Sequence, residues 1–177
     1  MAKKDGKSKK DGKSKKASKS TRKATPATST LARLGIPYAL HTYEHDPRVE
    51  QYGEEAAQEL GVDPHRVFKT LVADVDGDPI VAVVPVSTKL DLKALAAAVG
   101  GKRAVMADPE RAERITGYPV GGISPLGQRT ELPTVLDTSA MDHESILVSA
   151  GRRGMDLEIM GTHLIAALNA RTAPIAR

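Results

Sequence analysis

The sequence predicts one α+β domain built on a mixed sheet. First, the predicted strands outnumber the predicted helices. Second, two apolar, β-branched runs at 67–75 and 80–86 are joined at 76–79 by Asp-Gly-Asp-Pro, which is a hairpin turn signal. Third, strands and helices do not alternate regularly, as a βαβ winding would require. A chain of 177 residues is long enough for one domain with its own core.

The first half of this domain is predicted from apolar spacing and glycine stops. Leucines at helical spacing predict a helix at 26–34, and Gly35 ends it. Residues 38–43 are typical of a strand. An acidic helix follows at 52–60 and ends at Gly61. These elements precede the hairpin.

The second half begins with a helix at 91–99, which a Gly-Gly pair ends, and a short strand at 103–106. Asp108 is a helix N-cap followed by proline, so a helix is expected up to residue 115. A turn-rich loop then occupies 117–132. The remaining elements are strands at 134–136, 146–149 and 155–159 and a helix at 162–170.

Residues 1–24 differ from the predicted domain at 25–177. They carry eleven Lys and Arg and two Asp, a net charge of +9, whereas the rest of the chain has a net charge of −5. The segment KKDGKS occurs at 3–8 and again at 9–14, and KKASKS follows at 15–20. With nothing to bury, this Lys-rich tail is expected to be disordered. It could hold polyanions such as RNA, or it could be an extension without a target.

The composition excludes several classes of protein. The chain has no cysteine, which excludes disulfides, thiolate metal ligands and a cysteine nucleophile, and fits a reducing cytoplasm as its location. No apolar run approaches 18 residues, so no membrane span is expected. With no Trp, one Phe and four Tyr, broad aromatic stacking on single-stranded bases is not expected.

A lysine interrupts the first strand of the predicted hairpin. In the stretch RVFKTLVA at 66–73, both strand faces are largely apolar except at Lys69. A lysine in such a strand must either reach solvent along its own stem or meet a negatively charged or carbonyl-bearing ligand. The residues alone leave both interpretations open.

The loop sequence GYPVGGISPLG at 117–127 resembles a phosphate loop in the spacing of Gly122 and Gly127. However, Gln-Arg at 128–129 replaces the required Lys-Ser/Thr, so an NTPase is excluded. Adjacent glycines let the backbone approach a ligand closely, and Ser124 with the following proline sets the course of the loop. A loop of this length in a compact domain favours a binding loop.

Other polar residues carry weaker signals. His41, Tyr43 and His45 would share one face of a strand, but no third ligand is evident, so no metal site is expected. The arginines at 152–153 could bind phosphate or carboxylate, or simply lie on a hairpin. Asp156 begins a strand and could point into a cleft. No Ser-His-Asp arrangement is visible, so the residues indicate a ligand-binding domain of unspecified substrate.

Five longer motifs resemble the YbaK family, which comprises free-standing aminoacyl-tRNA deacylases related to the editing domain of bacterial prolyl-tRNA synthetases. The sequence is most similar to the branch that hydrolyses cysteinyl-tRNA(Pro) and cysteinyl-tRNA(Cys). The resemblance runs from about Thr25 to the C-terminus and leaves out the Lys-rich tail. The motifs are HTYEHDP at 41–47, VFKTLV at 67–72, TKLDLKALA at 88–96, MADPERAERITGYPVGGISPLGQ at 106–128 and GRRGMDLE at 151–158.

The resemblance implies a mostly antiparallel, barrel-like sheet with flanking helices and a site that takes the 3′ end of an aminoacylated tRNA. It implies no cofactor, and it makes prolyl-tRNA synthetase a candidate partner. The implied catalytic residues are Lys69, Gly121 and Asp156, and the implied substrate-binding residues are Tyr43, Lys69, Gly121, Gly122 and Ser124.

The resemblance also implies a mechanism in which the substrate's own thiol attacks the ester and releases a cyclic thiolactone. Two alternatives remain open. One is an alanyl- or seryl-tRNA deacylase of the same family. The other is a non-catalytic module that binds tRNA or a synthetase.

Overall fold

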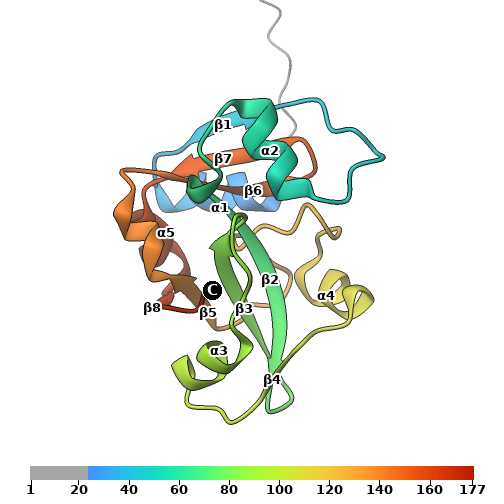
Figure 1. Ribbon diagram of the computed structural model, residues 1–177. Coiled ribbons are helices and arrows are strands. Elements are labelled where there is room, and N and C mark those ends of the chain that lie inside the picture. The colour runs from blue at the N-terminus through green and yellow to red at the C-terminus, as the bar shows by residue number, and fades with distance from the viewer. Residues whose placement is uncertain (1–23) are drawn as a thin grey trace, which may run out of the picture.

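The structure is a computed structural model that describes residues 24–177 (Figure 1). The predicted disorder of the Lys-rich tail falls on residues outside this range. The α-helices are α1 (Pro26–Leu34), α2 (Tyr52–Leu60), α3 (Leu92–Ala98), α4 (Pro109–Thr116) and α5 (Gly161–Leu168), with 3-10 turns η1 (Pro64–Arg66) and η2 (Thr138–Asp142). The strands are β1 (Ala39–Thr42), β2 (Val67–Val75), β3 (Asp78–Pro85), β4 (Ala104–Met106), β5 (Thr134–Asp137), β6 (Ile146–Arg152), β7 (Met155–Ile159) and β8 (Arg171–Ala173).

The strands form one eight-stranded sheet in the order β1-β7-β6-β2-β3-β5-β8, with β4 paired to β2. The pairs β1–β7, β2–β3, β2–β4 and β6–β7 are antiparallel, while β2–β6, β3–β5 and β5–β8 are parallel. The predicted α+β class and mixed, mostly antiparallel sheet are therefore confirmed. Figure 1 shows β1, β7 and β6 crossing β2 and β3 steeply, so the sheet is strongly curled.

Strand β2 has an open stretch on one edge, and this stretch positions the site. On one side β3 pairs with it from Phe68 to Val75. On the other side β6 pairs only with Val67 and Phe68, and β4 pairs only with residues 73–75. Among the described strands, none pairs with residues 69–71 on this edge. The sheet therefore splits at the middle of β2.

The hairpin between β2 and β3 is tighter than predicted. The turn consists of Asp76 and Gly77, with φ of 51° and 96°, and β3 already begins at Asp78. Positive φ at both central residues is the type I′ geometry that suits the twist of paired strands. Pro79 lies opposite Asp74 inside the ladder. β8, η1 and η2 were not predicted, because such short elements carry little periodicity.

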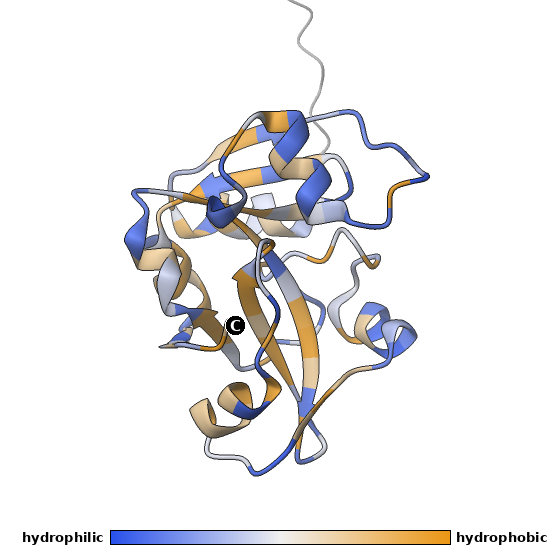
Figure 2. Ribbon diagram, viewed as in Figure 1, coloured by the Kyte–Doolittle hydropathy of each residue, from blue (hydrophilic) through white to orange (hydrophobic). Residues whose placement is uncertain are grey.

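The core lies on both faces of the β2–β3 hairpin. Val81 and Val83 pack with the side chains beneath α1 and α5, while Ile80, Ala82 and Val84 pack with α3. Figure 2 shows both strands largely in hydrophobic colours. None of the helices within residues 24–177 has the length and apolar character needed to cross a bilayer.

Candidate active site

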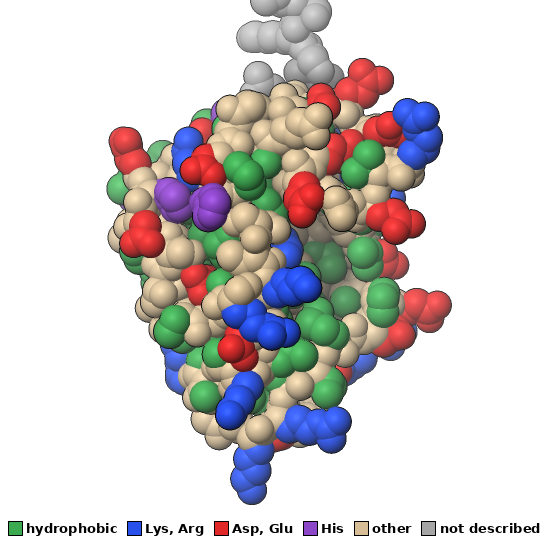
Figure 3. Space-filling model, viewed as in Figure 1, with side chains coloured by type: hydrophobic (Ala, Val, Ile, Leu, Met, Phe, Trp, Pro, Cys, Tyr) green, Lys and Arg blue, Asp and Glu red, His purple; other side chains and the backbone are tan. Residues whose placement is uncertain are grey.

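A cleft of about 400 Å³ opens at the split in the sheet. Its walls are α2, the middle of β2, the beginning of α4 and the glycine loop that follows α4. Figure 3 shows a hollow lined by hydrophobic side chains where these elements meet. A largely apolar cleft with a few polar groups is the usual form of a small-ligand site.

The structure brings four of the six predicted site residues to this cleft. Tyr43, Lys69, Gly121 and Asp156 all line it. They come from the segment after β1, from β2, from the glycine loop and from β7, which are far apart in sequence. The sheet order places these segments next to one another.

Gly122 and Ser124 are not among the lining residues. The Ser124 side chain is 0% exposed, and its hydroxyl oxygen accepts a hydrogen bond from the Leu126 backbone N–H at 3.3 Å. A Cβ added to Gly122 would lie 3.0 Å from the Cα of Arg152, so this glycine permits close packing on the β6–β7 hairpin. Both residues shape the loop from within.

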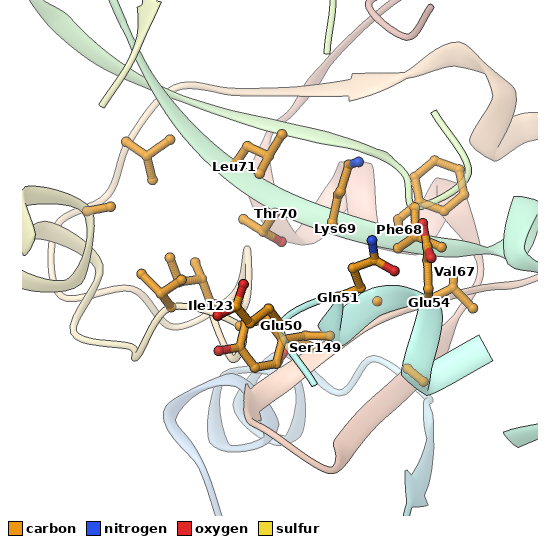
Figure 4. A pocket seen from close by; sticks show the side chains of 18 of the residues that line it. Glu50, Gln51, Glu54, Val67, Phe68, Lys69, Thr70, Leu71, Ile123 and Ser149 are labelled. Carbon is orange, nitrogen blue, oxygen red and sulfur yellow. The ribbon is translucent and has the colours of Figure 1, made fainter. Parts of the chain in front are cut away.

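Lys69 is half-buried in the wall of the cleft (Figure 4). Its ammonium donates a hydrogen bond to the backbone carbonyl of Thr88 at 2.6 Å. Burial lowers the pKa of Lys69, the carboxylate of Glu54 acts in the opposite direction, and the nearby Lys89 lowers it further. The lysine therefore meets a carbonyl of its own chain and remains beside the cleft with donors to spare.

Asp156 lies at a different part of the cleft, where β1, β7 and β6 run side by side. It is paired across strands with His41 and with Ser149, and it is 6% exposed. Burial raises the pKa of Asp156 to about 6, and the nearby His41 opposes this rise. Burial and the charge of Asp156 raise the pKa of Tyr43, so its phenol stays protonated.

Thr70 is a cleft residue that the sequence analysis missed. Its hydroxyl oxygen is buried without a hydrogen-bond partner among the described residues. Because the Val67 carbonyl accepts from the Val86 N–H of the β3 side, the alternation along β2 turns the Thr70 backbone toward the open edge. Figure 4 shows the Thr70 side chain pointing into the cleft. Thr70 therefore brings an unpaired hydroxyl to the open stretch of β2, and no sequence signal marks it.

Tyr52, at the start of α2, was also missed, and it holds the glycine loop in place. Gly121 has a φ of +82°, and a Cβ added there would lie 2.5 Å from the Tyr52 ring. The guanidinium of Arg153 lies 4.8 Å from the centre of the same ring and donates two hydrogen bonds to the Val120 carbonyl, at 3.0 and 2.7 Å. The loop backbone is thus clamped between α2 and the β6–β7 hairpin.

The two histidines of the HTYEHDP motif are each paired with a carboxylate. The Nε2 atom of His41 lies 2.8 Å from the Oε2 atom of Glu158. The Nδ1 atom of His45 lies 2.7 Å from the Oε2 atom of Glu55 on α2. The prediction that they share a strand face is wrong, because β1 ends at Thr42. The first pair joins β1 to β7, and the second attaches the segment after β1 to α2.

The lining of the cleft offers no activated protein nucleophile. It contains neither histidine nor cysteine, and its aliphatic hydroxyls are those of Thr70 and Ser149. The Ser149 oxygen accepts from the Gly151 N–H at 3.2 Å. Within residues 24–177, no hydrogen bond joins a lining hydroxyl to a carboxylate or an imidazole. Such a cleft suits a reaction in which the ligand or water supplies the nucleophile.

Comparisons with known proteins agree with this geometry. Residues 46–167 match the family model of the aminoacyl-tRNA editing domain. A protein of Enterococcus faecalis, named as a candidate Cys-tRNA(Pro)/Cys-tRNA(Cys) deacylase, EbsC, is 36% identical over 156 residues, which cover 88% of this chain and 94% of the relative. A proline–tRNA ligase of Nitratidesulfovibrio vulgaris is 30% identical over 145 residues, which cover 82% of this chain but only 23% of the ligase.

The fold is also found among solved structures. The crystal structure of a candidate trans-editing enzyme for prolyl-tRNA synthetase superimposes with a TM-score of 0.77 at 24% identity, covering 86% of this chain and 95% of that one. The family model covers most of the chain, and the Enterococcus relative is similar over nearly its whole length. The chain therefore belongs to the aminoacyl-tRNA editing-domain family, within the YbaK group that its motifs resemble.

Proposed function

We propose that the protein hydrolyses mischarged aminoacyl-tRNA and removes cysteine from Cys-tRNA(Pro) and Cys-tRNA(Cys). The observation that carries this proposal is a cleft with a half-buried lysine, a buried aspartate and no activated protein nucleophile. The name of the Enterococcus relative supports the substrate.

The positions of the two charges orient the substrate in the cleft. The ammonium of Lys69 binds a phosphate or ribose oxygen of the 3′-terminal nucleotide, because Lys69 is the one Lys or Arg residue among the described residues that line the cleft. The aminoacyl group extends toward Asp156 and Tyr43. The ester carbonyl then lies at Gly121, which lines the cleft and has no side chain to keep the loop backbone away from it.

The substrate thiol acts as the nucleophile. Asp156 accepts the thiol proton, and its pKa of about 6 suits a base working near neutral pH. The sulfur attacks the ester carbonyl and a C–S bond forms. The bond from the carbonyl to the ribose oxygen breaks, and that oxygen takes the proton back from Asp156. The products are free tRNA and a cyclic thiolactone, which water hydrolyses.

Positioning can supply most of the rate enhancement of this reaction. Holding a thiol and a carbonyl in reacting geometry contributes up to roughly 7–11 kcal/mol. One backbone donor to the oxyanion contributes roughly 3–4 kcal/mol. Neither contribution requires a protein hydroxyl, so Ser124→Ala should keep substantial activity.

A panel of charged tRNAs tests the proposal. Cysteinyl-tRNA should be hydrolysed fast. Seryl-tRNA should react slowly, because a hydroxyl is a far poorer nucleophile near pH 7. Alanyl-tRNA, with nothing to cyclise, should be nearly inert. Mass spectrometry with an amine trap should detect the thiolactone adduct. Fast release of free alanine would instead identify an alanyl-tRNA deacylase, and tRNA binding without any hydrolysis would identify a binding module.

Substitution of two glycines in one loop tests the role of Gly121. Gly121 and Gly117 both have positive φ, so the backbone conformation alone should make Gly121→Ala and Gly117→Ala each destabilise the fold by about 1–2 kcal/mol. At Gly117 the nearest atom lies 3.4 Å from the new Cβ, whereas at Gly121 the Tyr52 ring must move. Deacylation should therefore fall at least tenfold only in Gly121→Ala. Equal activity of the two folded variants would remove Gly121 from the site.

A further inference from the structure

Charge is divided between the two sides of the cleft. The segment 44–59, which includes most of α2, carries six Asp and Glu and a single Lys or Arg residue, Arg48. Figure 3 shows Asp and Glu gathered above and to the right of the hollow, and Lys and Arg gathered below it. A polyanion is therefore repelled from the α2 side of the opening and attracted to the opposite side.

The basic side is formed by Lys69, Lys89 and Lys93, which we call the basic surface. Lys69 is tied to Thr88, the residue before Lys89, by the bond from its ammonium to the Thr88 carbonyl at 2.6 Å. Lys93 lies four residues after Lys89, in the first turn of α3. Both Lys89 and Lys93 are exposed. The surface thus begins inside the cleft and continues outward onto α3.

The backbone beneath the basic surface is fixed. The N–H and carbonyl of Lys89 bond to the carbonyl and N–H of Arg177, each at 2.9 Å. Asp91, the acidic residue between the two exposed lysines, accepts from the Ala94 N–H as the cap of α3. Leu95 is fully buried and holds α3 on the core. The two lysines are therefore presented from rigid elements.

We propose that the basic surface binds the phosphates of the tRNA acceptor stem while the 3′ end occupies the cleft. This inference rests on the proposed function. The chain beyond residue 24 has a net charge of −5, so the basic surface is a local exception to an acidic domain. The one phenylalanine, Phe68, is 2% exposed, and there is no tryptophan. Recognition through phosphates therefore fits better than stacking on unpaired bases.

A charge-reversal experiment in the full chain tests this inference. The test variant is Lys89→Glu/Lys93→Glu, and the control is Arg33→Glu/Arg114→Glu, which makes the same charge change at exposed residues of α1 and α4. Each protein is assayed with cysteinyl-tRNA(Pro) and with a cysteinylated CCA trinucleotide, which lacks the stem. Binding of uncharged tRNA(Pro) is measured by filter binding at several salt concentrations.

The test variant should raise KM for cysteinyl-tRNA(Pro) at least tenfold, with kcat within twofold. Its activity on the trinucleotide should be unchanged. The log–log salt slope for uncharged tRNA should fall by about 1–2, since each lost phosphate contact contributes roughly 0.7–0.9. The control should leave all these quantities near wild type.

Three outcomes of the assays without added synthetase would overturn the inference. They are an unchanged KM for tRNA, an equal rise in the control, and an equal loss on the trinucleotide. A rise in KM that appears only when prolyl-tRNA synthetase is added would also overturn it, and would identify a protein-binding surface. If the proposed function itself is wrong, wild type hydrolyses neither ester. The binding of uncharged tRNA then still tests the basic surface.

Discussion

Lys69→Met should lower kcat/KM for cysteinyl-tRNA by at least about 100-fold while the protein stays folded, since losing one charge-stabilising group typically has an effect of this size. Methionine keeps most of the length of the side chain but has no ammonium to bind the terminal nucleotide. The Thr88 carbonyl loses its 2.6 Å donor, which destabilises the fold. Removal of an ammonium whose pKa is lowered by burial offsets that loss. Single-turnover deacylation and thermal unfolding measure the two effects separately.

Arg114→Met is the matched control, because it removes an exposed cation from α4. It should leave both activity and melting temperature near wild type. Lys69→Arg should recover little activity, since the planar guanidinium does not fit a position made for one compact ammonium. Wild-type turnover by folded Lys69→Met would assign Lys69 a purely structural role at Thr88.

Asp156→Asn should remove activity and at the same time stabilise the protein above pH 6. The wild-type carboxyl has its pKa raised from 3.8 to about 6 by burial. Such a difference corresponds to about 3 kcal/mol of destabilisation once the group is ionised. The amide carries no charge and avoids this cost, but it cannot accept the thiol proton.

The raised pKa of Asp156 makes the stability of the wild-type protein depend on pH. Between pH 3.8 and about 6, folded Asp156 keeps a proton that the unfolded chain has lost, so wild-type stability falls as pH rises through this window. The stability gain of Asp156→Asn should therefore be near zero below pH 3.8 and complete above pH 6. Asp142→Asn, which removes an exposed carboxylate, serves as the control.

The pH dependence of activity follows from the same group. Wild-type kcat/KM should fall about tenfold for each pH unit below 6, because protonated Asp156 is no longer a base. The residual activity of Asp156→Asn should not show this fall in kcat/KM below pH 6. Chemical denaturation and deacylation across pH 4–8 measure both curves. A variant that keeps full activity at pH 7 would exclude Asp156 as the base.

Most secondary structure could be predicted because its signals are local. Gly35 and Gly61 both end helices at the predicted positions with φ of 67° and 63°. Asp108 caps α4 as expected, and its carboxylate accepts from the Glu110 N–H. The turn at Asp76 was predicted at the correct place, but the predicted range 76–79 is two residues too long. Asp78 and Pro79 already belong to β3.

The candidate site could be predicted only in part. Lys69 is visible in the sequence because a cation in an apolar strand is unusual. Gly121 and Asp156 were named through a family resemblance, and the structure places them at the same cleft. Ser124 was named as a substrate-binding residue together with them, yet it is fully buried. Polarity and loop context do not reveal which way a side chain points.

By itself, the sequence determined the fold class, the helix ends, the Lys69 anomaly and the family resemblance, since each depends on residues close together in the chain. Only the tertiary structure decided where the cleft lies, because β2 is left open between β6 and β4, whose positions depend on long-range pairing. It also decided the clamp of Tyr52 on Gly121 and the unpartnered hydroxyl of Thr70. These features follow from which distant segments come into contact, and no local pattern of residues encodes that.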